Sequence, residues 1–469
     1  MIKRIICPAI IICGFAGSLI AQAPKPGATA KGKPATSRQG SASGGNILPY
    51  PISQKKLANG LNVVAVPFDS PGLAAFYIVV RVGSRNEIEE GKTGFAHFFE
   101  HMMFRGTDKY SKEKYDQVLK SVGASANANT SLDRTIYHMT GNAAKLETMF
   151  EIEADRFQHL NYSVPDFKAE AGAVKGEYTK NNSSPYNQLE EQIQNTAFDK
   201  HTYRHTTIGF FNDIVDMPNQ FEYSRQFFNR YYRPEYATII VVGDVNAAKV
   251  NALATKYFGN WKAGNYQVTV PEEPEQKEVR HTHLKNGNIP PFVSLNYKGP
   301  AFSIKEKDFA TLDVISSLLF SERSDLYKKL VIKDQKVRRL DGGALDTRDP
   351  SLFSVEVSLV KESDMEEIKN EITKRMEELK TIPVDEKLLA DTKSHLKYSF
   401  AMRVDNPDAI ANSLAHYVSL TGNPESVNML YKMYDSISGQ DIMNVAKKYF
   451  VDNHLTIATI SGSDSSPLK

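Results

Sequence analysis

The sequence predicts an α+β fold with two tandem homologous domains, each a mainly antiparallel sheet packed with helices. Strand-like and helix-like patterns follow one another in runs instead of alternating strictly, which favours α+β over a doubly wound parallel sheet. The chain has 469 residues, 41% of them hydrophobic, which is enough for two or three packed domains. The second half also repeats short motifs of the first half.

Two pairs of motifs indicate this repeat. "LANG" at 57–60 returns as "LKNG" at 284–287. "YYRPEYATIIVVGD" returns in outline as "KYFVDNHLTIATISGSD", with Thr238 matched to Thr456. Similar offsets near the start and the end of each half predict duplication of a unit of about 220 residues.

The domain boundaries follow from composition. A charged, proline-containing stretch, "VPEEPEQKEVR" at 270–280, predicts an interdomain linker. It separates an N-terminal domain at 47–269 from a C-terminal domain at 281–464, which a short tail follows at 465–469. Within the first domain the patterns predict strands at 61–68 and 74–84, helices at 93–105 and 112–121, a strand at 128–140, long helices from 145 to 181, and a closing strand within 232–245.

The N-terminus has the features of an export signal. Lys3 and Arg4 give a positive start, 5–20 are almost wholly apolar, and "AQA" at 21–23 offers the small residues that signal peptidase prefers. The apolar run is shorter than the roughly 20 residues that cross a bilayer. We therefore expect a cleaved signal peptide at 1–23 and a periplasmic or otherwise secreted protein, with an uncleaved membrane anchor as the alternative.

The segment after the signal is rich in Pro, Gly, Ala, Ser and Lys at 24–46, so we expect a disordered leader there. Both cysteines, Cys7 and Cys13, leave with the signal peptide, and the mature protein then has no disulfide. The formal charge of +2 falls to zero without Lys3 and Arg4. No basic patch or tail in the sequence indicates nucleic-acid binding.

The segment "TGFAHFFEHMMFRGT" at 93–107 carries the main chemical signal. At about 100° per residue, most of its phenylalanines and its methionines gather on one side of a helix, whereas His97, Glu100 and His101 share the other side. Thr93 is the predicted N-cap. The segment therefore predicts a helix with one apolar side and one side that presents two imidazoles and a carboxylate.

These three polar residues suit a metal-dependent hydrolase. Histidines at i and i+4 project from adjacent turns and can bind one ion, which zinc accepts at about 2.0–2.1 Å. A carboxylate outside the coordination sphere can take the proton of an attacking water, and Glu100 suits that role. The alternative is that His97 and His101 are solvated or hydrogen-bonded side chains. However, a chance His-x-x-Glu-His is expected in only about one or two chains of this length per hundred.

The motif also carries a resemblance, because His-x-x-Glu-His inverts the commoner His-Glu-x-x-His order. "GFAHFFEHMMFRGTDKY" resembles the active-site helix of the pitrilysin-like, M16-type zinc peptidases, which include the mitochondrial processing peptidases. "SANANTSLDRTIYHMT", "EAGAVKGEYTK" and "YYRPEYATIIVVGDV" resemble later segments of that family, and "GPAFSIKEKDFATLDVISSLLFSERSDLYKKLV" resembles the C-terminal domain of its two-domain members. The resemblance implies the metallohydrolase fold shared by LuxS and these peptidases, with catalysis in the N-terminal domain.

The resemblance further implies one zinc ion per chain, held by His97, His101 and Glu177, with Glu100 as the catalytic base. Glu170 and Glu177 are seven residues apart and share a helix face within about 20°. On that pattern alone they suit a solvated surface. The resemblance assigns Glu177 to the metal and Glu170 to a supporting role in catalysis.

The family also binds its substrate as an added strand on a sheet edge, and Asn127 and Ala128 match the pair whose backbone groups serve that edge. Main-chain pairing of this kind gives affinity without requiring a particular peptide sequence. An ordinary edge or internal strand is the alternative at these two positions.

One departure from the family bears on partners. Members that act alone carry an arginine and a tyrosine in the C-terminal domain that hold the substrate and stabilise the oxyanion, and the aligned positions here hold Val331 and Arg338. Donors of this kind contribute roughly 10²–10³ in rate. The resemblance therefore implies a heterodimer with a related subunit that lacks the zinc motif and supplies the pair, with a homodimer as the fallback.

Together these features predict a zinc-dependent endopeptidase that cuts unfolded peptides with a metal-activated water. The alternative is a non-catalytic scaffold or peptide-binding subunit with the same fold. A metal-storage protein is disfavoured because three ligands and an unliganded glutamate leave an open coordination position.

Overall fold

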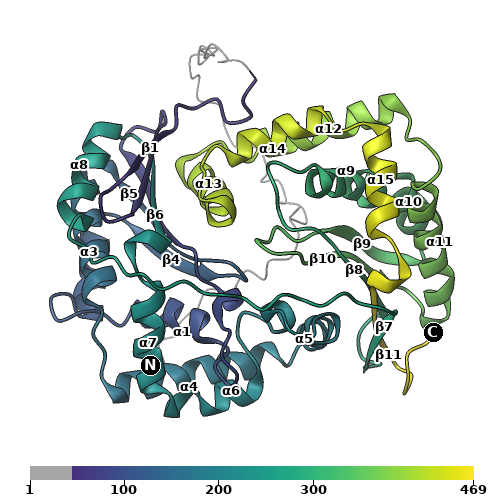
Figure 1. Cartoon of the computed structure of the whole chain (residues 1–469), viewed down its shortest axis with the longest axis horizontal. Helices are drawn as coiled ribbons and strands as arrows, with labels where there is room; N and C mark the ends of the chain where they lie inside the picture. The colour runs from purple at the N-terminus through teal and green to yellow at the C-terminus, as the bar shows by residue number, and fades with distance from the viewer. Residues whose placement is uncertain (1–44, 469) are drawn as a thin grey trace, which may run out of the picture. The chain divides into compact units, whose positions relative to one another are not determined.

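The computed structural model describes residues 45–468 (Figure 1). The predicted signal peptide, both cysteines and the leader as far as residue 44 lie outside the described residues. The described part holds two sheets with helices packed on them, and the predicted α+β class with two similar halves is confirmed. No helix between residues 45 and 468 combines the length and the apolar character that a membrane span requires.

The N-terminal half is built on a sheet in the order β1-β2-β6-β3-β5-β4, in which only β2 and β6 run parallel and β4 lies at one edge. The single strand predicted at 128–140 is wrong, because the chain reverses at 131–134, where the N–H of Ser131 donates to the carbonyl oxygen of Arg134 at 2.8 Å. The strands are β1 (Ser53–Lys56), β2 (Asn62–Pro67), β3 (Leu73–Val80), β4 (Ser125–Thr130), β5 (Thr135–Asn142) and β6 (Ala237–Gly243).

The C-terminal half repeats this topology, without a counterpart of β1, in the order β7-β11-β8-β10-β9, again with one parallel pair, β7 and β11. Thr238 and Thr456 are both second residues of the central strands β6 and β11, as the repeat predicts. "LANG" precedes β2, whereas "LKNG" closes the equivalent strand β7, so this pair of motifs does not mark equivalent positions. The strands are β7 (Arg280–Lys285), β8 (Phe292–Lys298), β9 (Val337–Ala344), β10 (Leu352–Leu359) and β11 (Leu455–Ser461).

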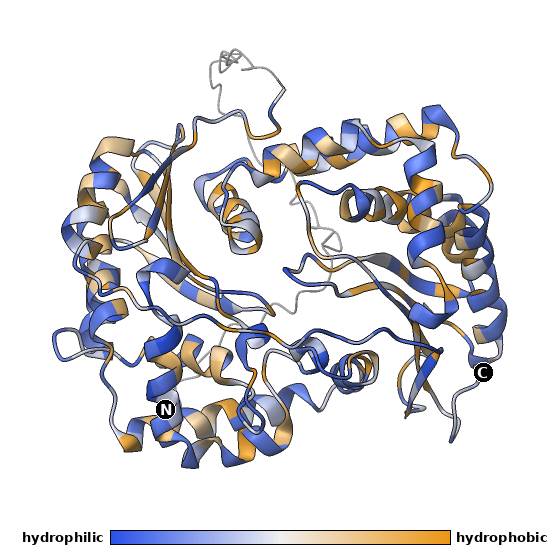
Figure 2. Ribbon diagram, in the orientation of Figure 1, coloured by the Kyte–Doolittle hydropathy of each residue, from blue (hydrophilic) through white to orange (hydrophobic). Residues whose placement is uncertain are grey.

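The helices confirm the predicted helical regions at 93–105, 112–121 and 145–181. Many of them carry hydrophilic residues on one side and hydrophobic residues on the other (Figure 2). They are α1 (Phe95–Met102), α2 (Lys112–Ser121), α3 (Leu146–His159), α4 (Val164–Asn181), α5 (Pro185–Ala197), α6 (Phe211–Asp216), α7 (Phe221–Tyr231) and α8 (Ala247–Phe258), then α9 (Asp308–Phe320), α10 (Asp325–Tyr327), α11 (Met365–Glu378), α12 (Glu386–Ala401), α13 (Pro407–Thr421), α14 (Ser426–Asp435) and α15 (Gly439–Tyr449).

Each half places one helix on the sheet of the other half. Helix α13 covers the N-terminal sheet, where Tyr77 of β3 donates from its hydroxyl to Oδ1 of Asp408 at 2.9 Å. Helix α5 covers the C-terminal sheet, and its Leu189 and Ile193 pack in one apolar cluster with Phe292. Figure 1 shows α5 beside β7 and β11. The halves are therefore interlocked as well as linked in sequence.

This exchange explains why β3 is buried on both faces. Its residues Phe76 and Ile78 belong to the cluster that includes α1, whereas Tyr77 and Val79 belong to the cluster that includes α13. Successive side chains of a strand point to opposite faces, so a strand covered on both sides is apolar throughout. The same layering fixes α1 against one face of the N-terminal sheet.

Candidate metal site

Helix α1 aims its two histidines away from the core. Phe95, Phe98, Phe99 and Met102 are all 0% exposed and pack against the sheet and neighbouring helices. This burial accounts for the orientation of α1, since fully burying such side chains contributes about 1.5–3 kcal/mol each. His97, on the remaining side, retains slight exposure, as the helical pattern predicts.

The start of α1 differs from the prediction. The N-cap is Gly94, at φ 91°, and not Thr93. A Cβ on Gly94 would lie 2.5 Å from Cδ1 of Ile214 and 2.6 Å from the carbonyl oxygen of Ile208, so only glycine fits. Thr93 instead ties neighbouring segments together, because its hydroxyl donates to Asp213 at 2.6 Å and accepts from the N–H of Phe210 at 2.8 Å. A close approach between segments has overruled the local capping preference.

A buried carboxylate that sequence reasoning missed caps α1. Glu87 accepts the N–H groups of Gly94 and Ala96, each at 2.7 Å, through its two oxygens. Burial raises the pKa of the Glu87 carboxyl to about 8, although these two backbone hydrogen bonds favour its ionised form. The ionised form of Glu87 also meets the positive end of the helix dipole. The loop position of Glu87 gave no periodic signal by which to find it.

Helix α4 brings two glutamates to α1. It begins with a capping box between Ser163 and Asp166. Phe167, 0% exposed, packs its ring 5.1 Å from that of Phe98 on α1, which sets the two helices side by side. Glu170 and Glu177 then face α1 at a spacing of two turns.

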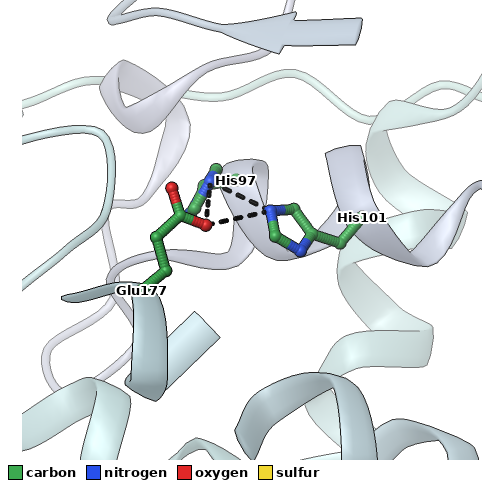
Figure 3. Close-up of side chains that lie close together, drawn as sticks. All are labelled: His97, His101 and Glu177. Atoms are coloured by element: carbon green, nitrogen blue, oxygen red, sulfur yellow. Dashed lines mark hydrogen bonds and ion pairs between the residues drawn. The ribbon is translucent and has the colours of Figure 1, made fainter. Parts of the chain in front are cut away.

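His97, His101 and Glu177 converge on one point (Figure 3). The Nε2 atoms of His97 and His101 lie 3.2 Å apart. Oε2 of Glu177 lies 3.7 Å from Nε2 of His97 and 3.4 Å from Nε2 of His101. Within residues 45–468, this is the one group of three metal-binding side chains whose ligand atoms come so close together.

These distances fit zinc. Ligand atoms about 2.0–2.2 Å from a tetrahedral ion lie about 3.3–3.6 Å from one another, close to the three separations observed. Two imidazoles and one carboxylate are also a donor set of catalytic zinc, with the fourth position open.

The electrostatics agree with a site that takes up a cation. Burial opposes the charged form of His101, but hydrogen bonds to Glu170 and Glu177 outweigh it and raise its pKa to about 10. Burial lowers the pKa of His97, against the attraction of Glu100. A proton on His101 therefore holds the position that a metal ion takes, and the two compete.

Glu170 contacts the outer nitrogen of a ligand and not the point of convergence. Its Oε1 lies 3.0 Å from Nδ1 of His101, and its Oε2 accepts from Nε of Arg105 at 2.5 Å. An acceptor at Nδ1 selects the tautomer whose Nε2 lone pair is free for a metal. Glu170 thus lies where it can orient His101, and its role in catalysis stays a prediction.

Glu100 lies on α1 between the two histidines, half-buried. Its charge acts on His97 and also on His138 of β5. The side chain of Glu100 makes no hydrogen bond or ion pair within residues 45–468. A carboxylate so placed is free to accept a proton.

Asn127 and Ala128 lie on β4, the edge strand, which packs beside α1. The N–H of Ala128 donates to Oδ1 of the exposed Asn127 at 2.9 Å. At the other aligned positions, Val331 sits half-buried in a π-helical turn at Lys328–Lys333, and Arg338 is exposed on β9. The edge is thus in place, whereas the arginine–tyrosine pair is absent from the positions where the resemblance expects it.

Comparison with known proteins agrees with this geometry. Residues 64–209 match the family described as "Insulinase (Peptidase family M16)", and residues 220–396 match "Peptidase M16 inactive domain". Zinc protease PqqE of Helicobacter pylori is 31% identical over 407 residues, which cover 85% of this chain and 90% of the relative. The chain belongs to peptidase family M16.

Solved structures show the same M16 fold. A protease from Helicobacter pylori superposes with a TM-score of 0.80 at 30% identity, covering 88% of this chain and 99% of that one. The periplasmic protease PqqL from Escherichia coli superposes with a TM-score of 0.72 at 19% identity, covering 89% of this chain and 49% of that one. Membership in M16 implies zinc as the metal, and the donor set of His97, His101 and Glu177 fits it.

Proposed function

We propose that this M16 chain is a zinc-dependent endopeptidase that cleaves unfolded peptides. The observation that carries the proposal is the convergence of His97, His101 and Glu177 beside an unpaired Glu100. Zinc bound there would lower the pKa of a water molecule to near neutrality and polarise the carbonyl of the scissile bond.

The chain's own residues supply the remaining chemistry. Glu100 takes the proton of the attacking water and passes it to the leaving amine, since its carboxylate has no competing hydrogen bond within residues 45–468. Glu170 holds His101 through Nδ1 at 3.0 Å. The edge of β4 at Asn127 and Ala128 receives an extended peptide through main-chain pairing, which requires that segment of the substrate to be unfolded.

The N-terminal sequence supports export, so the proposed location is the periplasm or another exported compartment, where the PqqL protease with the same fold also works. The proposed boundaries remain a signal peptide at 1–23, a leader at 24–46, domains at 47–269 and 281–464 joined by 270–280, and a tail at 465–469.

We propose a heterodimer as the active form. Val331 and Arg338 leave this chain without the arginine and tyrosine expected to stabilise the oxyanion, and a related subunit without the zinc motif would supply them. A homodimer is the fallback. Co-purification with partners, followed by assay of each fraction, tests this arrangement.

The second candidate is a non-catalytic scaffold of the same fold, which the absent arginine–tyrosine pair favours. Glu100→Gln discriminates the two candidates on a quenched fluorescent peptide library. The endopeptidase proposal expects the variant to keep its zinc and lose cleavage by at least about 10², the lower range for general acid–base groups. Cleavage that persists in the variant removes Glu100 from the mechanism, and absence of cleavage by the wild type with its co-purified partner favours the scaffold.

A further inference from the structure

Arg105 ends a row in which basic and acidic side chains alternate, and the row begins at the metal ligands. His97 and His101 lie one turn apart on α1, and Arg105 follows in the turn after the helix ends at Met102. Glu177 meets the first two of them, and Glu170 meets the last two.

The contact between Arg105 and Glu170 is short and partly sheltered, since the Arg105 side chain is 32% exposed. Nε of Arg105 donates to Oε2 of Glu170 at 2.5 Å, and the Glu170 side chain is 9% exposed. The other oxygen, Oε1, faces Nδ1 of His101 at 3.0 Å. Each oxygen of Glu170 therefore has one partner, both from the segment that carries the metal ligands.

Two partners fix the plane of the Glu170 carboxylate, whereas one partner leaves it free to rotate about its last side-chain bond. Rotation would move Oε1 away from Nδ1 of His101 and release the imidazole from the orientation that points Nε2 at Glu177. Removing one partner also leaves a buried carboxylate oxygen unsatisfied, which is unfavourable. Arg105 thus acts on His101 through Glu170.

We infer that Arg105 is a positioning residue for the metal site, one that locks Glu170 and thereby the tautomer and orientation of His101. This inference rests on the proposed zinc site. It assigns Arg105 no contact with substrate and no direct contact with the metal. The expected consequence is on zinc affinity, and its upper bound is the contribution of Glu170, since direct partners of metal-binding histidines typically contribute 10–100-fold.

The test measures zinc affinity by competition with a fluorescent chelator, in the full mature chain. Arg105→Met keeps the aliphatic stem and removes the donor, and we expect zinc affinity to fall by about 10-fold, within the loss that Glu170→Gln causes. Arg105→Lys restores a cationic donor with a different geometry, and we expect it to recover part of that loss. The matched control is Lys109→Met. Lys109 lies on the same loop as Arg105, its side chain is 53% exposed, and it pairs with Glu151 at 2.8 Å. The control should bind zinc as the wild type does.

A double-mutant cycle shows whether Arg105 acts through Glu170. If it does, Arg105→Met combined with Glu170→Gln weakens zinc binding no more than the stronger single variant, within about threefold, because coupled residues are not additive. Independent roles would multiply the two losses and overturn the inference. With zinc saturating and the co-purified partner present, Arg105→Met should also keep the KM of the wild type.

Other outcomes also contradict the inference and are separable from failure of the proposed function. A raised KM with unchanged zinc affinity would make Arg105 a substrate contact. Unchanged zinc affinity in Arg105→Met, in a wild-type background that binds zinc, would remove its positioning role alone. Thermal unfolding of the metal-free variants identifies any that fail to fold, and Arg105→Lys, which keeps the ion pair, then carries the comparison. A wild type that binds no zinc would instead refute the site itself.

Discussion

Arg85 of the N-terminal half and Asp349 of the C-terminal half form a two-pronged ion pair, with Nε and Nη2 donating to the two carboxylate oxygens at 2.5 and 3.0 Å. His201 adds a third contact, its Nε2 lying 3.0 Å from Oδ2 of Asp349. Together with the exchanged helices α5 and α13, this cluster fastens the halves to each other.

Asp349 should make the protein sensitive to acid. Burial opposes its charge, but the hydrogen bonds from His201 and Arg85 outweigh it and hold the pKa of Asp349 well below its ordinary value. As the pH falls, the unfolded chain therefore protonates Asp349 at a higher pH than the folded protein does. The stabilisation is present above a pH of about 4 and is lost as the pH falls further. Asp349→Asn should lower the free energy of unfolding at neutral pH by about 1–3 kcal/mol. Denaturant unfolding at several pH values measures both effects.

The matched control for Asp349 is Asp391→Asn on α12. Asp391 pairs with Lys387, but their side chains are 63% and 84% exposed. Such a pair contributes about 0–1 kcal/mol, so this variant should unfold as the wild type does. An equal decrease in the free energy of unfolding in the two variants would contradict a special role for Asp349.

Glu87→Gln should destabilise α1. An amide offers one oxygen in place of two, so one of the N–H groups of Gly94 and Ala96 loses its acceptor inside the protein. The expected cost is about 1–3 kcal/mol in the free energy of unfolding of the metal-free protein. A stability equal to that of the wild type would show that Glu87 does not cap the helix.

The same residue predicts a pH dependence of unusual sign for a carboxyl group. Burial raises the pKa of Glu87 from 4.5 to about 8, so the folded protein holds a proton that the unfolded chain has lost. Its contribution to stability is complete below pH 4.5 and falls as the pH rises towards about 8. Glu87→Gln should flatten that part of the curve of stability against pH. An unchanged slope would place the titration elsewhere.

Gly94→Ala should damage the metal site through the backbone. Its φ of 91° is unfavourable for alanine, and the new Cβ would meet Ile214 and the Ile208 carbonyl. We expect a loss of stability of at least about 1–2 kcal/mol and weaker zinc binding. Gly172→Ala is the control, since nothing lies within 4 Å of its Cβ on helix α4. That change should be neutral or stabilising by up to about 1 kcal/mol. A tolerated Gly94→Ala would contradict the close packing at the start of α1.

Ala128→Pro tests the edge strand. Proline removes the N–H of Ala128, which donates to the side chain of the neighbouring Asn127. Edge strands accept proline, because one of their sides has no strand to pair with. The protein should therefore fold and bind zinc, while KM for peptides rises and cleavage falls. Peptide kinetics alongside zinc content measure this. Unchanged kinetics would place the substrate elsewhere.

The metal helix could be predicted from the sequence because the relevant signal is local. A helical wheel separates Phe98 and Met102 from His97 and His101, and the structure has the same separation. Glu177 came from a family resemblance, since an acidic pair at i and i+7 has no unique meaning by itself. The repeated topology was visible at Thr238 and Thr456, although "LANG" and "LKNG" fall at different points of the two halves.

The features that sequence reasoning missed all depend on contacts between distant segments. Glu87 caps α1 from a loop, and Gly94 replaces Thr93 as the N-cap because Ile214 leaves no room for a side chain. The exchange of α5 and α13 joins surfaces that are far apart in the chain. Helical periodicity predicts that one face of a helix is apolar, but it does not predict which element packs against that face. The same holds for Arg105, which follows α1 and whose partner Glu170 lies on α4.

The central claim is that His97, His101 and Glu177 bind one zinc ion, and anomalous diffraction at the zinc edge from crystals of the mature protein tests it most directly. We predict one strong anomalous peak per chain, within about 2.0–2.2 Å of both Nε2 atoms and of a Glu177 carboxylate oxygen. A zinc-loaded crystal with its peak elsewhere, or with Glu177 turned away from the ion, would contradict the claim.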